Sequence, residues 1–129
     1  MFGSEFWTTK KKREKKIHTN EMKMLRWAAG VTRLDRVRNE YVRGSFKVAP
    51  IAENMAESCM RWFGYVMRRD EEYAVKKALA IPEQKNGKGM PLTTWSTTVT
   101  KDMERVQINT QTTHDRKTWR LQTRRADPK

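Results

Sequence analysis

Apolar residues along this chain recur at intervals of three and four, the spacing that places side chains on one face of an α-helix. The clearest case runs from about residue 50 to 69, where Pro50 suits a first helical position and Arg68 and Arg69 reach the carboxyl end. Its apolar positions are Ile51, Met55, Cys59, Trp62, Phe63 and Val66. We predict a helix here with one buried face.

A second periodic segment runs from about Thr8 to Ala29, and Gly30 supplies its stop. The stripe expected to face the interior comprises Ile17, Glu21, Met24, Leu25 and Ala28. Lysines and an arginine occupy the opposite face near its start. We therefore predict an amphipathic helix with a basic outer surface.

Thr32 and Asp35 have the spacing of a capping box, with aspartate in place of the usual glutamate or glutamine. This pair predicts a short helix that begins at Thr32 and ends near Gly44. Leu34, Val37 and Tyr41 would lie in register on its apolar side.

The remaining elements are less sharply marked. The acidic residues at 70–72 resemble the start of a helix through about Leu79, although residues 73–75 also suit a strand. Prolines, glycines and lysines predict a basic loop over 81–91. Further helices are expected over about 92–104 and 114–124, the first carrying Trp95 and the second Trp119.

These elements predict an all-α chain, a small irregular bundle of about five or six helices with a frayed C-terminus. We expect one domain overall: a basic helical region over 1–81, a loop over 82–91 and a helical region over 92–129. Leu, Ile, Val and Phe make up only about a sixth of the 129 residues. The expected core is thin and relies on eight Met and five Trp.

The charge is strongly unbalanced, because 28 Lys and Arg face 15 Asp and Glu and leave a net charge of +13. Such an excess attracts polyanions, and a nucleic acid gains affinity when its phosphates are neutralised and counterions are released. The same field would attract ribosomal assemblies, anionic membranes or acidic proteins. Charge alone therefore favours nucleic acid without excluding the others.

The basic run near the N-terminus has three interpretations: a solvated helix face, a surface that follows phosphates, or a nuclear-import signal. Its members are Lys10, Lys11, Lys12, Arg13, Lys15 and Lys16. The C-terminal end is basic too, through Arg116, Lys117, Arg120, Arg124 and Arg125. Both patches can contact one nucleic acid only if the fold brings them to one surface.

Trp27, Trp62, Trp95 and Trp119 each belong to a different expected helix. One interpretation makes each ring the main core contact of its helix. The other has one or two rings stacking on unpaired bases, as in proteins that bind single strands. Both remain open at this point.

Catalytic chemistry finds little support in the sequence. The one acidic cluster, at 70–72, lacks the context of a two-metal site, and His18 and His114 are far apart. Cys59 lies on an apolar stripe, and a single cysteine makes neither a disulfide nor a zinc knuckle. We expect no enzyme, no metal and no cofactor, and neither a signal peptide nor a membrane span.

Short phrases in a fixed order carry a resemblance to a known family. They are Phe2–Trp7, Glu21–Trp27, Thr32–Glu40, Arg61–Gly64, Arg68–Arg69, Asp115–Arg116 with Trp119–Arg120, and Ala126–Pro128. In this order they resemble the segment that follows the polymerase domain in reverse transcriptases of non-LTR (LINE-type) retrotransposons. The chain departs from that pattern at Tyr65, where the family has histidine, and at Met90, where it has arginine.

The resemblance implies a truncated, non-catalytic, nuclear segment that holds RNA or DNA without sequence preference. The contact residues expected from charge and resemblance are Lys10, Lys11, Lys12, Arg13, Lys15, Lys16, Arg61, Arg68, Arg69, Lys88, Arg116, Lys117, Arg120, Arg124 and Arg125. The alternative is a structural remnant that docks on an upstream reverse transcriptase domain.

Overall fold

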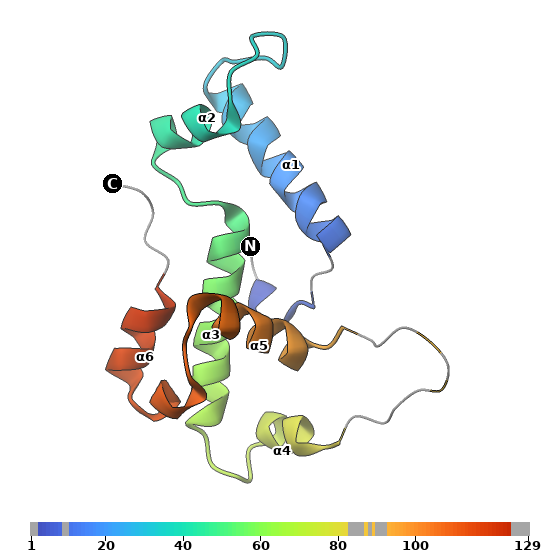
Figure 1. Cartoon of the computed structure of the whole chain (residues 1–129), viewed down its shortest axis with the longest axis vertical. Helices are drawn as coiled ribbons and strands as arrows, with labels where there is room; N and C mark the ends of the chain where they lie inside the picture. Colours follow the sequence, from blue (N-terminus) through green and yellow to red (C-terminus); the bar gives the residue numbers. More distant parts are fainter. Residues whose placement is uncertain (1–2, 9–10, 83–86, 88, 90–92, 125–129) are drawn as a thin grey trace. The chain divides into compact units, whose positions relative to one another are not determined.

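The computed structural model describes residues 3–8, 11–82, 87, 89 and 93–124. Within these ranges the chain forms six α-helices, two short 3-10 helices and no strand, which confirms the all-α fold class (Figure 1). In chain order the elements are η1 (Ser4–Phe6), α1 (Lys11–Ala28), α2 (Asn39–Phe46), α3 (Ile51–Met67), α4 (Ala74–Ala80), α5 (Trp95–Val106), η2 (Thr110–His114) and α6 (Arg116–Thr123).

The chain divides into two compact units, and the division falls inside α3 between Met55 and Ala56. We call residues 11–55 the α1–α2 unit, and residues 3–8 with 56–124 the α3–α6 unit. The expected boundary at 82–91 lies largely outside the described residues.

In the α1–α2 unit, α1 ends where the sequence predicted. Gly30 has φ +66, and Val31 and Gly30 donate backbone hydrogen bonds to Arg26 (2.9 Å) and Trp27 (3.1 Å). This is the bonding of a Schellman motif, which favours glycine at the left-handed position. The predicted inner stripe is wrong in part, because Met22 is buried whereas Met24 is 66 % exposed.

Glu21 fixes the face that α1 presents to the rest of its unit. One carboxylate oxygen accepts from the Arg43 guanidinium of α2 at 2.5 Å, and the other accepts from the amide of Ile51 at the start of α3 at 3.1 Å. Figure 1 shows α2 lying beside the C-terminal end of α1. Since Glu21 and Met22 turn inward together, Met24 is directed to solvent.

The helix predicted to begin at Thr32 does not form there. The Asp35 carboxylate accepts from the amide (2.6 Å) and the hydroxyl (2.8 Å) of Thr32. A full capping box needs the hydroxyl to accept from the backbone instead, so the pair closes a turn. Arg36 then takes φ +52, and α2 begins only at Asn39. Its buried residue is Val42, whereas Leu34 and Tyr41, predicted to face inward, are 89 % and 74 % exposed.

The prediction for α3 is confirmed. The Pro50 carbonyl accepts the first helical hydrogen bond from Glu53 at 2.9 Å, and Met55, Cys59 and Val66 of the predicted stripe are buried. The helix ends at Met67, immediately before the two arginines.

In the α3–α6 unit the core joins α3, α5 and α6. It consists of Ala56, Cys59, Met60, Val99, Met103 and Trp119. Trp119 is 2 % exposed, and its indole Nε1 donates to the Met60 carbonyl at 3.0 Å. Trp95 packs against this core and donates to the Glu5 carbonyl at 2.7 Å. Both tryptophans therefore confirm the core interpretation, with their N–H groups satisfied.

The shorter elements follow local chemistry. Glu71 and Glu72 pair with Lys76 and Lys77 at 2.5 Å, and the segment after them is the helix α4, so the strand interpretation is wrong. Thr94 caps α5 through a full capping box with Thr97. Asp115 caps α6, and hydrogen bonds from the Thr118 hydroxyl and from backbone amides lower its pKa. The end predicted to fray, after Arg124, lies outside the described residues.

Gly64 is required by the packing of Trp119. A Cβ atom at Gly64 would overlap the indole ring, with Cδ1 only 2.6 Å away. Because the ring is buried and hydrogen-bonded, it has little room to retreat. The packing of Trp119 thus explains why the last position of the Arg61–Gly64 phrase is glycine.

We expect Gly64→Ala to lower the free energy of unfolding, because overpacking costs about 1–3 kcal/mol and exceeds the roughly 0.5–1 kcal/mol that alanine adds to a helix. Gly44→Ala in α2 is the control, since nothing lies within 4 Å of its new Cβ, and it should be neutral or stabilising. Chemical denaturation followed by circular dichroism measures both. Equal stability of the two variants would contradict the steric role.

Cys59 is buried, with Sγ 3.6 Å from the Ser4 carbonyl, and burial raises the pKa of its thiol to about 11. The thiolate is the reactive form. At pH 8 we therefore expect the folded protein to react with a disulfide reagent far more slowly than the protein in guanidinium. Rapid stoichiometric reaction of the folded protein would show that the thiol is accessible.

Candidate nucleic-acid interface

The first turns of α1 carry a dense group of exposed cations. They are Lys11, Lys12, Arg13, Lys15 and Lys16. At about 100° per residue they cover an arc of roughly 200° around the helix. Glu14 is the one acidic residue among them, and cations near a helix N-terminus oppose its dipole. A polyanion bound there would reduce both the repulsion among these cations and their unfavourable interaction with the helix dipole.

The second group of cations lies on α6. Arg116, Arg120 and Arg124 follow one another at i, i+4 spacing, and with Lys117 they span an arc of about 100°. All four are exposed. Arg68 lies near this group but is only partly exposed, and burial together with the nearby charge of Arg116 lowers the pKa of its guanidinium. It also donates to the Thr113 carbonyl at 2.8 Å.

Two predicted contact residues are engaged within their own unit. Arg61 pairs with Glu57 at 2.5 Å. Arg69 donates to the Tyr65 hydroxyl and lies over the Tyr65 ring, 4.5 Å from its centroid, and these contacts raise its pKa. Lys10, Lys88 and Arg125 lie outside the described residues. The structure thus places Arg68 near the α6 group. Arg61 on α3 and Arg69 just after α3 instead contact side chains close to them in sequence.

The four tryptophans fall into different environments. Trp119 and Trp95 belong to the core, and Trp62 is partly buried between Phe6, edge-on at 4.8 Å, and Tyr65, stacked at 5.0 Å between centroids. Trp27 is 85 % exposed at the end of α1, so the core interpretation is wrong for this ring. Its direction follows from the inward turn of Glu21 and Met22.

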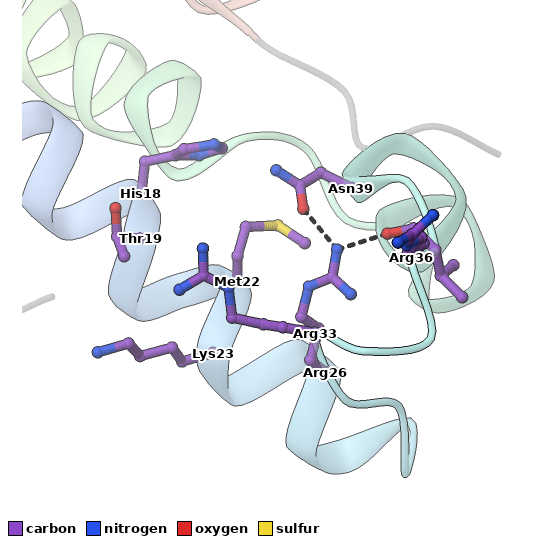
Figure 2. A pocket seen from close by; sticks show the side chains of 9 residues that line it. His18, Thr19, Met22, Lys23, Arg26, Arg33, Arg36 and Asn39 are labelled. Carbon is purple, nitrogen blue, oxygen red and sulfur yellow. Dashed lines mark hydrogen bonds between the residues drawn. The ribbon is translucent and has the colours of Figure 1, made fainter.

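A cationic pocket that the sequence did not predict lies between the C-terminal half of α1 and the loop 31–38 (Figure 2). Its volume is about 360 Å³, and four basic side chains line it: Lys23, Arg26, Arg33 and Arg36. His18 completes one wall, and no carboxylate side chain belongs to the lining. The four basic residues are separated along the sequence, and placing them around a pocket requires the loop conformation.

Arg26 holds this loop in place. One of its terminal nitrogens donates to the Val37 carbonyl (2.6 Å) and to the Asn39 side chain (2.9 Å), and the other to the Thr32 carbonyl (3.5 Å). Figure 2 shows the bonds to Val37 and Asn39 to one side of the pocket and the Arg33 side chain extending from the loop back across α1. The loop is therefore shaped by protein contacts before any ligand arrives.

Within the described ranges, no group of three or more His, Cys, Asp or Glu side chains is placed to hold a metal ion. Among the same residues no helix is long and apolar enough to cross a bilayer. No family model, curated protein or solved structure matches this chain.

We expect Arg26→Lys, which keeps the charge but loses the forked donors, to loosen the loop. Losing a charged hydrogen bond of roughly 1.5 kcal/mol corresponds to about tenfold more opening. Limited trypsin digestion should then cleave after Arg33 and Arg36 about tenfold faster. Arg38→Lys, at an exposed position with no capping hydrogen bond, is the control. Equal cleavage of both variants would refute the locking role.

Proposed function

We propose that this chain is a non-catalytic helical module that binds the backbone of RNA or DNA electrostatically and without sequence preference. The observation that carries the proposal is the exposure of cations in both units: five on the first turns of α1, and four at Arg116, Lys117, Arg120 and Arg124. The neutralisation of phosphates by such side chains supplies most of non-specific affinity.

The ordered phrases of the sequence support the same proposal. They resemble the post-polymerase segment of LINE-type reverse transcriptases, which implies a nuclear polypeptide near template RNA or target DNA. Two of these phrases have a structural reason in this chain: Gly64 accommodates Trp119, and Arg26 holds the loop 31–38. The proposed module grips nucleic acid and leaves the chemistry to other domains.

A second candidate function rests on the exposed apolar side chains of the α1–α2 unit. Met24, Trp27, Leu34 and Tyr41 are each more than half exposed. In that candidate they dock on an upstream reverse transcriptase domain, and the cations serve solubility.

We expect a labelled 20-nucleotide RNA to bind with about micromolar affinity, and the logarithm of the dissociation constant to rise linearly with the logarithm of salt. Replacing Lys11, Lys12, Lys15 and Lys16 with glutamine should weaken binding and reduce the slope by up to about 3, at roughly 0.7 per lost phosphate contact. Fluorescence anisotropy between low and physiological salt measures both quantities.

The matched control replaces four lysines outside the cationic groups, Lys47, Lys76, Lys77 and Lys101, so that net charge falls equally. It should retain most of the affinity. If the two variants bind alike, only the overall charge matters. If neither the variants nor the unmodified protein bind RNA, the result favours the second candidate function, docking on an upstream reverse transcriptase domain.

A further inference from the structure

We propose that the pocket between α1 and the loop 31–38 holds a backbone phosphate of single-stranded nucleic acid, and that Trp27 stacks on an adjacent base. This inference rests on the proposed function and assigns a local site to it. None of the pocket cations was among the contact residues expected from the sequence.

The chemistry of the pocket selects an anion. Arginine and lysine side chains are donors only, and four of them line one cavity of about 360 Å³. Arg26 is engaged in holding the loop, whereas Lys23, Arg33 and Arg36 are exposed. A guanidinium fork matches two oxygens of a phosphate at once. Because no carboxylate lines the pocket, no side chain of the lining neutralises these charges.

The nearby carboxylates are engaged elsewhere. Asp35 accepts both Thr32 donors, and these hydrogen bonds lower its pKa. Glu21 is held by Arg43 and by the amide of Ile51. Among the described residues, no hydrogen bond or ion pair joins the Arg33 or Arg36 side chain to another group. Both guanidinium groups are exposed and available to a ligand.

The site is also pre-organised. Arg36 sits at φ +52, a conformation that non-glycine residues adopt rarely, and the Thr32–Asp35 turn before it fixes the separation of Arg33 and Arg36. Arg26 ties the far end of the loop to α1. A ligand therefore meets a formed site and loses little affinity to ordering the loop.

Trp27 supplies the second element of recognition. It follows Lys23 by four residues on α1, and such positions are neighbours on a helix surface, with Cβ atoms about 5–6 Å apart. Its indole is 85 % exposed. A phosphate held beside Lys23 would bring a base within reach of this ring. In a duplex the bases are paired and stacked, so the combination favours single strands.

The test measures the affinity of a labelled 12-nucleotide oligo-dT and of a 12-base-pair duplex for five proteins. They are the unmodified chain, Arg33→Gln/Arg36→Gln, Trp27→Ala, Trp27→Phe, and the control Arg38→Gln/Lys47→Gln, which removes two exposed charges from the same unit outside the pocket lining. Circular dichroism verifies that each is folded, as expected for substitutions at exposed positions.

We expect oligo-dT to bind more tightly than the duplex. The double arginine variant should lose at least about tenfold in oligo-dT affinity, since two charged hydrogen-bonding groups are removed. Trp27→Ala should lose about fivefold or more, the lower limit for one stacked base, whereas Trp27→Phe keeps most of the affinity. The control should change it no more than about twofold.

The alternatives give different results. If the arginine variant loses no more than the control while the unmodified protein binds, the pocket is not the site and the proposed function stands. If Trp27→Ala binds oligo-dT normally, the stacking role is overturned and the exposed ring fits a protein interface. If the unmodified protein binds the 20-nucleotide RNA but neither of these oligonucleotides, this site is overturned and the proposed function stands. If it binds none of the three, both fail.

Discussion

The structure depends on a small number of carboxylates, which form contacts between helices and cap their ends in a chain that carries many more cations. Fifteen acidic residues face 28 basic ones, and several of the acidic residues serve as joints or caps. Glu21 connects α1 to α2 and to the start of α3, Asp35 closes the turn after Gly30, and Asp115 caps α6. With these carboxylates engaged in structure, the cations on the first turns of α1, Lys23, Arg33 and Arg36 of the pocket, and Arg116, Lys117, Arg120 and Arg124 remain exposed. Their availability to a polyanion is thus a consequence of the architecture.

These carboxylate contacts also explain why one predicted helix formed and another did not. α3 has apolar residues on a complete stripe, so its buried face follows from periodicity, and Pro50 and the Arg68–Arg69 pair mark its ends. The segment 32–38 was predicted as helix because a Thr–Asp pair has the spacing of a cap. Its outcome depended on whether the Thr32 hydroxyl accepted or donated a hydrogen bond. The spacing of Thr32 and Asp35 does not determine the direction of this hydrogen bond. Because the hydroxyl donates, the segment forms a turn and not a helix start.

The candidate site was predictable to a similar degree. The basic runs of α1 and α6 are local properties of the sequence, and the structure leaves them exposed. The pocket was missed because it needs Arg36 in a left-handed conformation and Arg26 reaching 11 residues ahead to Val37. For Trp27 the sequence left a core contact and base stacking both open, because the apolarity of the ring does not fix which way it faces on α1. The polar joint at Glu21 sets its rotation instead.

The phrase Leu25-Arg26-Trp27 connects the scaffold to the proposed binding surface. Successive helical residues point about 100° apart, so the three side chains face different surroundings. Leu25 is partly buried, Arg26 holds the loop 31–38, and Trp27 faces solvent. Because the loop anchor and the exposed ring are adjacent residues of one helix, a strand stacked on Trp27 lies beside the loop that carries Arg33 and Arg36. In the site proposed here, the Arg26 contacts that order the loop would therefore also hold Arg33 and Arg36 where the strand needs them.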